Sequence, residues 1–153
     1  MFSDLPATLA ELAQAFGLPA LIPNERNQVA FTLEDGLTIT VTLPFQEGAT
    51  GQIIGEIARI TDNAFDDMAQ AMLALNGRLV ATAGASFALH PTNASVLVVL
   101  PFLESQLEPQ SFRRLVEQFI ELCRIWNEKI LRADSDLSLE TRIVAALDRS
   151  GID

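Results

Sequence analysis

The stretch 28-QVAFTLEDGLTITVTL-43 decides the fold of this chain, because its pattern fixes both a structure and a register. Apolar residues alternate with small polar residues on both sides of Glu34-Asp35-Gly36, and this alternation is typical of a β-hairpin. A three-residue loop sets Leu33 opposite Leu37, whereas a two-residue loop would set Leu33 opposite a threonine and mix the two faces. The pattern therefore predicts the three-residue loop, with Gly36 in a left-handed conformation.

Helices and further strands are expected on both sides of this hairpin. Apolar residues at helical spacing and glycine stops predict the helices, and short Val- and Ile-rich runs predict the strands. The expected elements are a helix over Ser3–Phe16, strands over Gly51–Ile60, Ser86–His90 and Ser95–Leu100, and helices over Ala64–Asn76, Pro109–Arg132 and Ser138–Ser150. This order predicts an α+β fold with an antiparallel five-stranded sheet, helices in the order α-βββ-α-ββ-α and a short C-terminal helix.

Some places in this fold can also be predicted. Gly51–Ile60 carries apolar residues on both faces, which favours a central position in the sheet, whereas Gln28–Leu33 could be an edge strand. The first and third helices are expected on one face of the sheet. Residues 1–132 are expected to form the domain, and residues 133–153 are expected to form an amphipathic helical extension.

Composition and charge exclude several classes of function. The 153 residues carry a formal net charge of −10, which argues against nucleic acid as a partner because phosphates require a basic surface. The apolar run Val96–Leu103 is too short for a bilayer, which takes about 20 residues, so no membrane insertion is expected. The N-terminus shows no signal peptide, and a single cysteine fits a reducing compartment. We therefore expect a cytoplasmic protein.

The sequence contains no credible catalytic or metal site. His90 is the only histidine, which excludes clusters of histidine ligands. Cys123 lies in the apolar stripe of the long helix, where a buried structural thiol is expected rather than a nucleophile. Residues 84–88 half-resemble a nucleophile elbow but lack its last glycine, and no glycine-rich phosphate loop follows a strand. We expect no enzyme, no metal and no cofactor.

The informative feature is apolar surface that the fold does not obviously cover. Met68 and Met72 lie on the apolar stripe of the middle helix, which can face either the core or a second copy of the chain. An unprotected edge strand at Gln28–Leu33 would invite pairing with another extended chain. Both features indicate a binding protein.

Four segments resemble the class I type III secretion chaperones, the Tir-chaperone family. They are Phe16-Gly-Leu-Pro, the hairpin, the Leu-Asn-Gly at the end of the middle helix, and Phe112–Trp126, and the resemblance covers roughly residues 3–131. It implies an ATP-independent, cytoplasmic bacterial chaperone without cofactors. Its client would be the N-terminal chaperone-binding segment of a secreted effector, bound in extended form and kept soluble for secretion.

The resemblance also implies where the chain makes its contacts. A homodimer interface would use the middle helix and the neighbouring strand, which maps onto Phe65, Met68, Met72, Leu75 and Phe87. The effector would contact the first helix and the first strands, which maps onto Phe16, Leu18, Leu21, Val29, Phe31 and Leu33. Ordinary core packing is the alternative for each of these residues.

Two other functions fit the same fold. The chain could be a regulatory or adaptor domain that binds a folded partner, or a carrier of a small hydrophobic ligand in a cavity between sheet and helix. A chaperone differs from an adaptor because a short, unfolded fragment of its partner suffices for binding.

Overall fold

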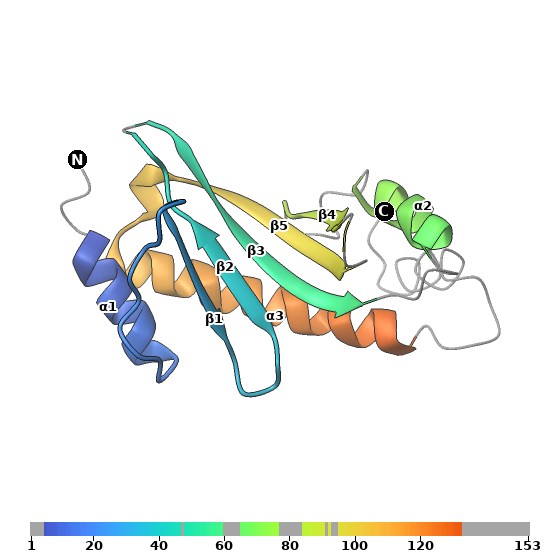
Figure 1. The fold of residues 1–153 in the computed structure, drawn as a ribbon, viewed down its shortest axis with the longest axis horizontal. Helices are drawn as coiled ribbons and strands as arrows, with labels where there is room; N and C mark the ends of the chain where they lie inside the picture. Colours follow the sequence, from blue (N-terminus) through green and yellow to red (C-terminus); the bar gives the residue numbers. More distant parts are fainter. Residues whose placement is uncertain are drawn as a thin grey trace. The chain divides into compact units, whose positions relative to one another are not determined.

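The computed structural model describes residues 5–46, 48–59, 65–76, 84–90, 92 and 95–132. Its elements are α1 (Leu5–Ala15), β1 (Gln28–Thr32), β2 (Thr38–Thr42), β3 (Thr50–Arg59), α2 (Phe65–Asn76), β4 (Ser86–Leu89), β5 (Ser95–Leu103), the 3-10 helix η2 (Glu104–Gln106) and α3 (Pro109–Arg132), as Figure 1 shows. The predicted order α-βββ-α-ββ-α is confirmed. The extension predicted over residues 133–153, with its helix Ser138–Ser150, lies outside the described residues.

The five strands form one antiparallel sheet in the order β1-β2-β3-β5-β4. The central position predicted for the third strand is confirmed, and β1 is an edge strand as expected. The other edge strand is β4. The α+β fold class is therefore confirmed, with one sheet and three α-helices among the described residues.

The hairpin has the predicted register. Val29 lies opposite Val41 and Phe31 opposite Ile39, so the apolar side chains of both strands share one face. The loop spans three residues, because the Leu33 N–H donates to the Leu37 carbonyl oxygen at 2.9 Å. Within the loop Gly36 has a φ of +90°, a conformation that glycine adopts without a steric penalty.

The chain divides into two compact units that share three elements. The first unit comprises Met1–Gly55 and Leu100–Glu121, and the second comprises Glu56–Val99 and Leu122–Asp153. Because these boundaries fall inside β3, β5 and α3, each of these elements contributes residues to both units.

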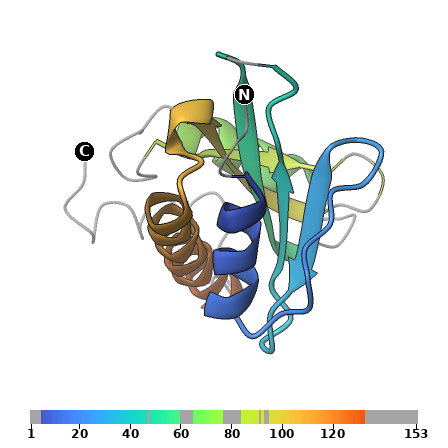
Figure 2. The same ribbon diagram turned by 90° about the vertical axis from the view of Figure 1, so that its left-hand side faces the viewer.

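In the first unit, α1 and the first part of α3 lie on the same face of the sheet, as predicted (Figure 2). The core between them is made by buried side chains from both layers, among them Leu12, Ile39 and Phe112. The Phe112 ring meets Phe102 edge-on, with centroids 5.0 Å apart. The buried Thr8 hydroxyl donates to the Leu107 carbonyl oxygen at 2.8 Å, which satisfies its polar atom inside this core.

In the second unit, the end of α3 supplies the core with its largest side chain. Trp126 is buried, and Phe87 from β4 meets its ring edge-on, with centroids 5.1 Å apart and planes at 79°. Val98 and Cys123 are also buried. The Asn127 amide donates to the Ile57 carbonyl oxygen and so ties α3 to β3 within this unit.

The strand predicted to end at Leu100 continues through Pro101 to Leu103. The bond from the His90 N–H to the Ser95 carbonyl oxygen shows that odd residues of β5 turn their backbone groups toward β4. Pairing with β4 ends at Val99, so the N–H that Pro101 lacks would have met no ladder partner on that side. The proline therefore costs no hydrogen bond of the sheet, and the strand does not stop.

Candidate functional site

The outer edge of β1 presents backbone groups that the sheet does not use. Hydrogen bonds between the Leu33 N–H and the Leu37 carbonyl oxygen, and between the Leu43 N–H and the Asn27 carbonyl oxygen, place the bonded pairs at odd positions of this strand. In an antiparallel ladder the intervening residues turn their N–H and C=O groups away from the partner strand. The outward residues of β1 are therefore Gln28, Ala30 and Thr32.

One of these three positions is already occupied. The Gln28 N–H donates to Asn24 Oδ1 at 3.0 Å, and the Gln28 carbonyl oxygen accepts from the Asn24 N–H at 2.9 Å. No described residue forms a hydrogen bond with the outward backbone groups of Ala30 or Thr32, whose side chains are exposed. As far as the described residues go, two N–H and two C=O groups are thus available for a further strand.

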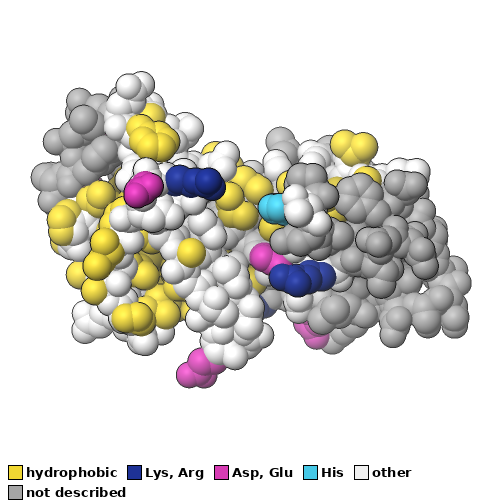
Figure 3. All heavy atoms as spheres, in the orientation of Figure 1, with side chains coloured by type: hydrophobic (Ala, Val, Ile, Leu, Met, Phe, Trp, Pro, Cys, Tyr) yellow, Lys and Arg dark blue, Asp and Glu magenta, His cyan; other side chains and the backbone are white. Residues whose placement is uncertain are grey.

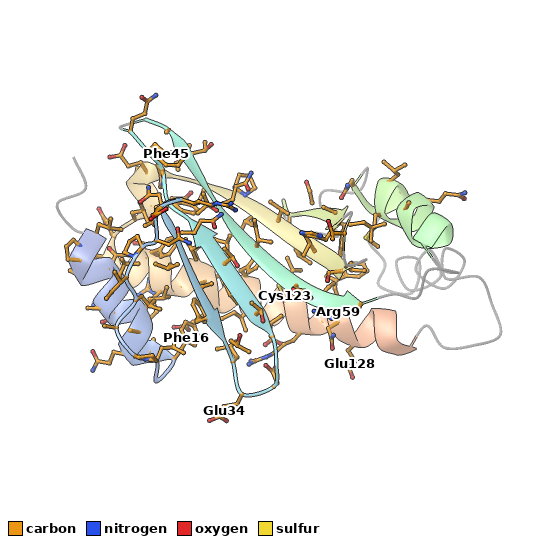
Figure 4. The ribbon with its side chains drawn as sticks, in the orientation of Figure 1. Phe16, Glu34, Phe45, Arg59, Cys123 and Glu128 are labelled. Carbon is orange, nitrogen blue, oxygen red and sulfur yellow. The ribbon has the colours of Figure 1, made fainter. Side chains whose placement is uncertain are left out.

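Apolar residues follow the end of α1 on the way to this edge. The Gly17 N–H donates to the Gln14 carbonyl oxygen and the Leu18 N–H to that of Ala13, a Schellman arrangement that uses the φ of +63° at Gly17. Phe16, next to this cap, stacks on Phe31 of β1, with ring centroids 5.9 Å apart. Figure 4 shows Phe16 beside the hairpin, on the side where α1 lies, and Glu34 at the tip of the hairpin.

The connector from α1 to β1, residues 18–23, carries the most exposed of these apolar residues. Ile22 is 79% exposed, and Leu18 and Leu21 are half-buried. In Figure 3 hydrophobic side chains gather over the part of the molecule where α1 lies in Figure 1. We call the outward backbone of Ala30 and Thr32, together with Phe16 and the connector, the edge surface.

The six residues predicted to contact an effector fall into two groups. Val29 and Phe31 are buried on the inner face of β1, and Phe31 is only 7% exposed. The other four are half-buried, namely Phe16, Leu18, Leu21 and Leu33. Their contact with an effector stays a prediction. Ile22 is not among the predicted contact residues, although its place between Pro19 and Pro23 indicates an extended connector with little room to bury it.

The residues predicted for a dimer interface lie on α2 and β4. Met72 is 4% exposed within a single chain, and Phe87 is equally buried against Trp126. The side chains of the other three, Phe65, Met68 and Leu75, lie outside the described part of the chain. Leu73 belongs to the apolar stripe of α2 and is 73% exposed, so it is the described residue of this helix that offers the most apolar surface. The interface itself stays a prediction.

A side chain occupies one outward position on the edge of β4. The Phe87 N–H donates to Asn76 Oδ1 at 2.6 Å, and Asn76 Nδ2 donates to the Phe87 carbonyl oxygen at 3.0 Å. A primary amide presents the same donor and acceptor as a peptide group, so this side chain takes the place of a neighbouring strand at Phe87. Within the described residues, the two edges of the sheet therefore differ in what they offer a partner.

The described residues show no arrangement suited to chemistry. Cys123 is fully buried, and burial raises the pKa of its thiol to about 12, so the reactive thiolate is scarce at neutral pH. No three His, Cys, Asp or Glu side chains within the described ranges are placed to hold a metal ion. Among the described helices none is long and apolar enough to cross a membrane.

A family model and solved structures match this chain. The model of the Tir chaperone protein (CesT) family matches residues 7–127. No curated protein sequence matches significantly. A chain of the ExsC–ExsE complex is similar in structure, with a TM-score of 0.69, 15% identity, and coverage of 84% of this chain and 94% of the other.

Two further structures show the same fold. A chain of the HopA1–SchA chaperone–effector complex has a TM-score of 0.61 at 15% identity, covering 80% of this chain and 91% of the other. A chain of the complex between the Yersinia pestis type III secretion chaperone SycH and a stable fragment of YscM2 has a TM-score of 0.50 at 14% identity, covering 79% and 98%. At these identities the likeness establishes the fold.

Proposed function

The chain belongs to the Tir chaperone protein (CesT) family, and from this premise we propose that it is a type III secretion chaperone in the bacterial cytoplasm. We propose that it binds the N-terminal segment of a secreted effector in extended form. The observation that carries this proposal is the outward edge of β1, where the backbone groups of Ala30 and Thr32 have no described partner. Two of the similar structures are named as a chaperone–effector complex and as a chaperone bound to a protein fragment.

The edge surface suits an extended and unfolded segment. A strand added beside β1 would have its own N–H and C=O groups satisfied by the backbone of Ala30 and Thr32. Its apolar side chains would cover Phe16, the connector and above all Ile22, which is largely exposed. The client would then bury the residues that cause aggregation while remaining locally unfolded.

Binding alone supplies the free energy for this activity. Ordering an unfolded segment costs free energy, and a segment that wraps a large surface recovers that cost from many weak contacts. A chaperone of this kind requires no ATP, in agreement with the missing phosphate loop in the sequence.

The decisive experiment is to remove one donor from the edge surface. Ala30→Pro deletes an N–H that points away from β2, so the β1–β2 ladder keeps all its hydrogen bonds and the fold is expected to survive. The ring also occupies the space where a client strand would lie. We expect binding to a co-purified N-terminal fragment of the effector to weaken by about tenfold or more, measured by calorimetry.

Ala30→Val is the matched control, because it changes the same exposed side chain but keeps the N–H. We expect it to bind as the wild-type chain does. Unchanged affinity of a folded Ala30→Pro variant would contradict strand addition at β1. A requirement for a folded domain of the partner would favour an adaptor instead, and a small hydrophobic adduct in native mass spectrometry would favour a ligand carrier.

We further propose that the chain forms a homodimer through α2 and β4. Leu73 is a better position than Met72 for a substitution that tests the dimer. Met72 is buried in its own chain, and a charge there would damage the fold. Leu73 is exposed, so Leu73→Glu should change the stability of the subunit by no more than about 0.5 kcal/mol. We expect this variant to be monomeric in light scattering.

The control for the dimer is Ile125→Glu. Ile125 is 42% exposed on α3, and this substitution places the same charge on an apolar surface residue outside the proposed interface. It should leave the mass of the particle unchanged. A dimer that persists in Leu73→Glu at micromolar concentration would place the interface elsewhere.

A further inference from the structure

We propose that Asn24 sets the limit and the register of the strand that the effector adds to β1. This inference rests on the proposed function. The client would form backbone hydrogen bonds with Ala30 and Thr32 and would end before Gln28, because Asn24 already occupies both outward groups of Gln28. Asn24 thus influences which client segments can bind, because it limits how many residues of β1 a client strand can pair with.

The turn that carries Asn24 is held by several hydrogen bonds. Asn24 Oδ1 accepts from the Arg26 N–H at 2.9 Å as well as from the Gln28 N–H, and the Asn24 carbonyl oxygen accepts from the Asn27 N–H at 3.0 Å. Asn27 adopts a φ of +60°, and its amide donates to the carbonyl oxygens of Leu43 and Pro44. The turn is therefore tied both to the start of β1 and to the end of β2.

The opposite end of the edge is limited by the hairpin loop. After Leu33 the chain enters the three-residue loop, where the Gly36 N–H donates back to the Leu33 carbonyl oxygen at 2.9 Å. Only Ala30 and Thr32 remain between the Asn24 turn and this loop. An antiparallel client strand would therefore form its bonded pairs with two residues that lie two apart in its own sequence.

This register predicts the pattern of the client segment. Residues directly opposite each other in a sheet share a face, so the two bonded client residues would share the exposed face of Ala30 and Thr32. The client residue between them would lie on the inner face beside Phe31, against which Phe16 already stacks. We therefore expect the segment to read polar, apolar, polar over these three positions. The residues that flank these three are also expected to be apolar, because they share the inner face with the middle residue.

Amide hydrogen exchange on the full-length, isotope-labelled chain tests this limit, both free and bound to the shortest effector fragment that the wild-type chain retains. In the free Asn24→Ala variant the Gln28 amide is expected to exchange about fivefold faster, because it loses its acceptor. With the fragment bound, Ala30 and Thr32 should gain protection in both proteins. The Gln28 amide should gain protection only in Asn24→Ala, since only there is its N–H free to bond the fragment, while the Gln28 carbonyl oxygen keeps its bond from the backbone N–H of residue 24.

Asn24→Asp is the matched control, because a carboxylate oxygen keeps the acceptor for Arg26 and Gln28. It should behave as the wild-type chain does in both states. Equal exchange of the Gln28 amide in all three proteins, or its further protection by the fragment in the wild-type chain, would overturn the inference. Failure of Ala30 and Thr32 to gain protection in the wild-type complex would instead contradict strand addition itself.

Discussion

Trp126→Ala is expected to lower the free energy of unfolding by about 3–5 kcal/mol, because it removes the largest fully buried side chain of the described core. The loss includes the transfer of the indole ring from water and the cavity that remains when neighbours relax only in part. It also includes the edge-on contact with Phe87, since aromatic pairs contribute about 0.5–1.5 kcal/mol beyond their buried area. Urea unfolding followed by far-UV circular dichroism measures the change.

The neighbouring Ile125→Ala serves as the control, because Ile125 is partly exposed on the same helix and should change stability far less. Trp126 and Phe87 belong to the same unit as α2 and β4. We therefore expect Trp126→Ala to weaken the proposed dimer as well as the fold. A loss of less than about 1 kcal/mol would show that the site collapses around the cavity, and that Trp126 does not hold this unit together.

Gly51→Ala is expected to have the second largest effect, a loss of about 1–3 kcal/mol through overpacking. A Cβ atom on Gly51 would lie 2.5 Å from the Thr42 carbonyl oxygen and 2.8 Å from Cε1 of Phe102. Real Cβ atoms essentially never approach so closely, and the carbonyl belongs to the backbone of β2, which cannot move alone. Thermal unfolding measures the loss.

The double variant Gly51→Ala/Phe102→Ala separates the two contacts. Removing the Phe102 ring relieves one clash but leaves the contact with the Thr42 oxygen, so the two losses should combine to less than their sum. Gln52→Ala controls for the strand, because Gln52 is the next residue of β3 and its side chain is exposed. A Gly51→Ala protein as stable as the wild-type chain would mean that β2 and β3 can separate locally without cost.

The regular parts of the fold could be predicted because their signals are local. The hairpin register follows from a two-residue period that allows only one loop length, and the observed pairing of Phe31 with Ile39 agrees. The bounds Pro109–Arg132 were predicted correctly for α3, since a proline begins the helix and one broad apolar face extends along it. The end of β5 was not predictable in this way, because it depends on where β4 stops pairing.

The candidate site could be predicted only in part. A period of two shows that Val29 and Phe31 share a face, but it does not show whether that face meets a helix or a client, and the structure places it in the core. The closed position at Gln28 depends on Asn24, whose side-chain bonds across a turn leave no periodic signal. The exposure of Leu73 within an apolar stripe likewise depends on which neighbours cover α2.

The amide of Asn76 at Phe87 has a consequence for how copies of the chain can join. A sheet can grow without limit from one molecule to the next only if both edge strands of every subunit can pair with another strand. Here β4 is only four residues long and a side chain occupies its backbone at Phe87, whereas β1 remains receptive. Among the described residues, pairing of two copies through β1 would therefore leave no equivalent open strand at Phe87, which disfavours growth of the sheet into a fibre.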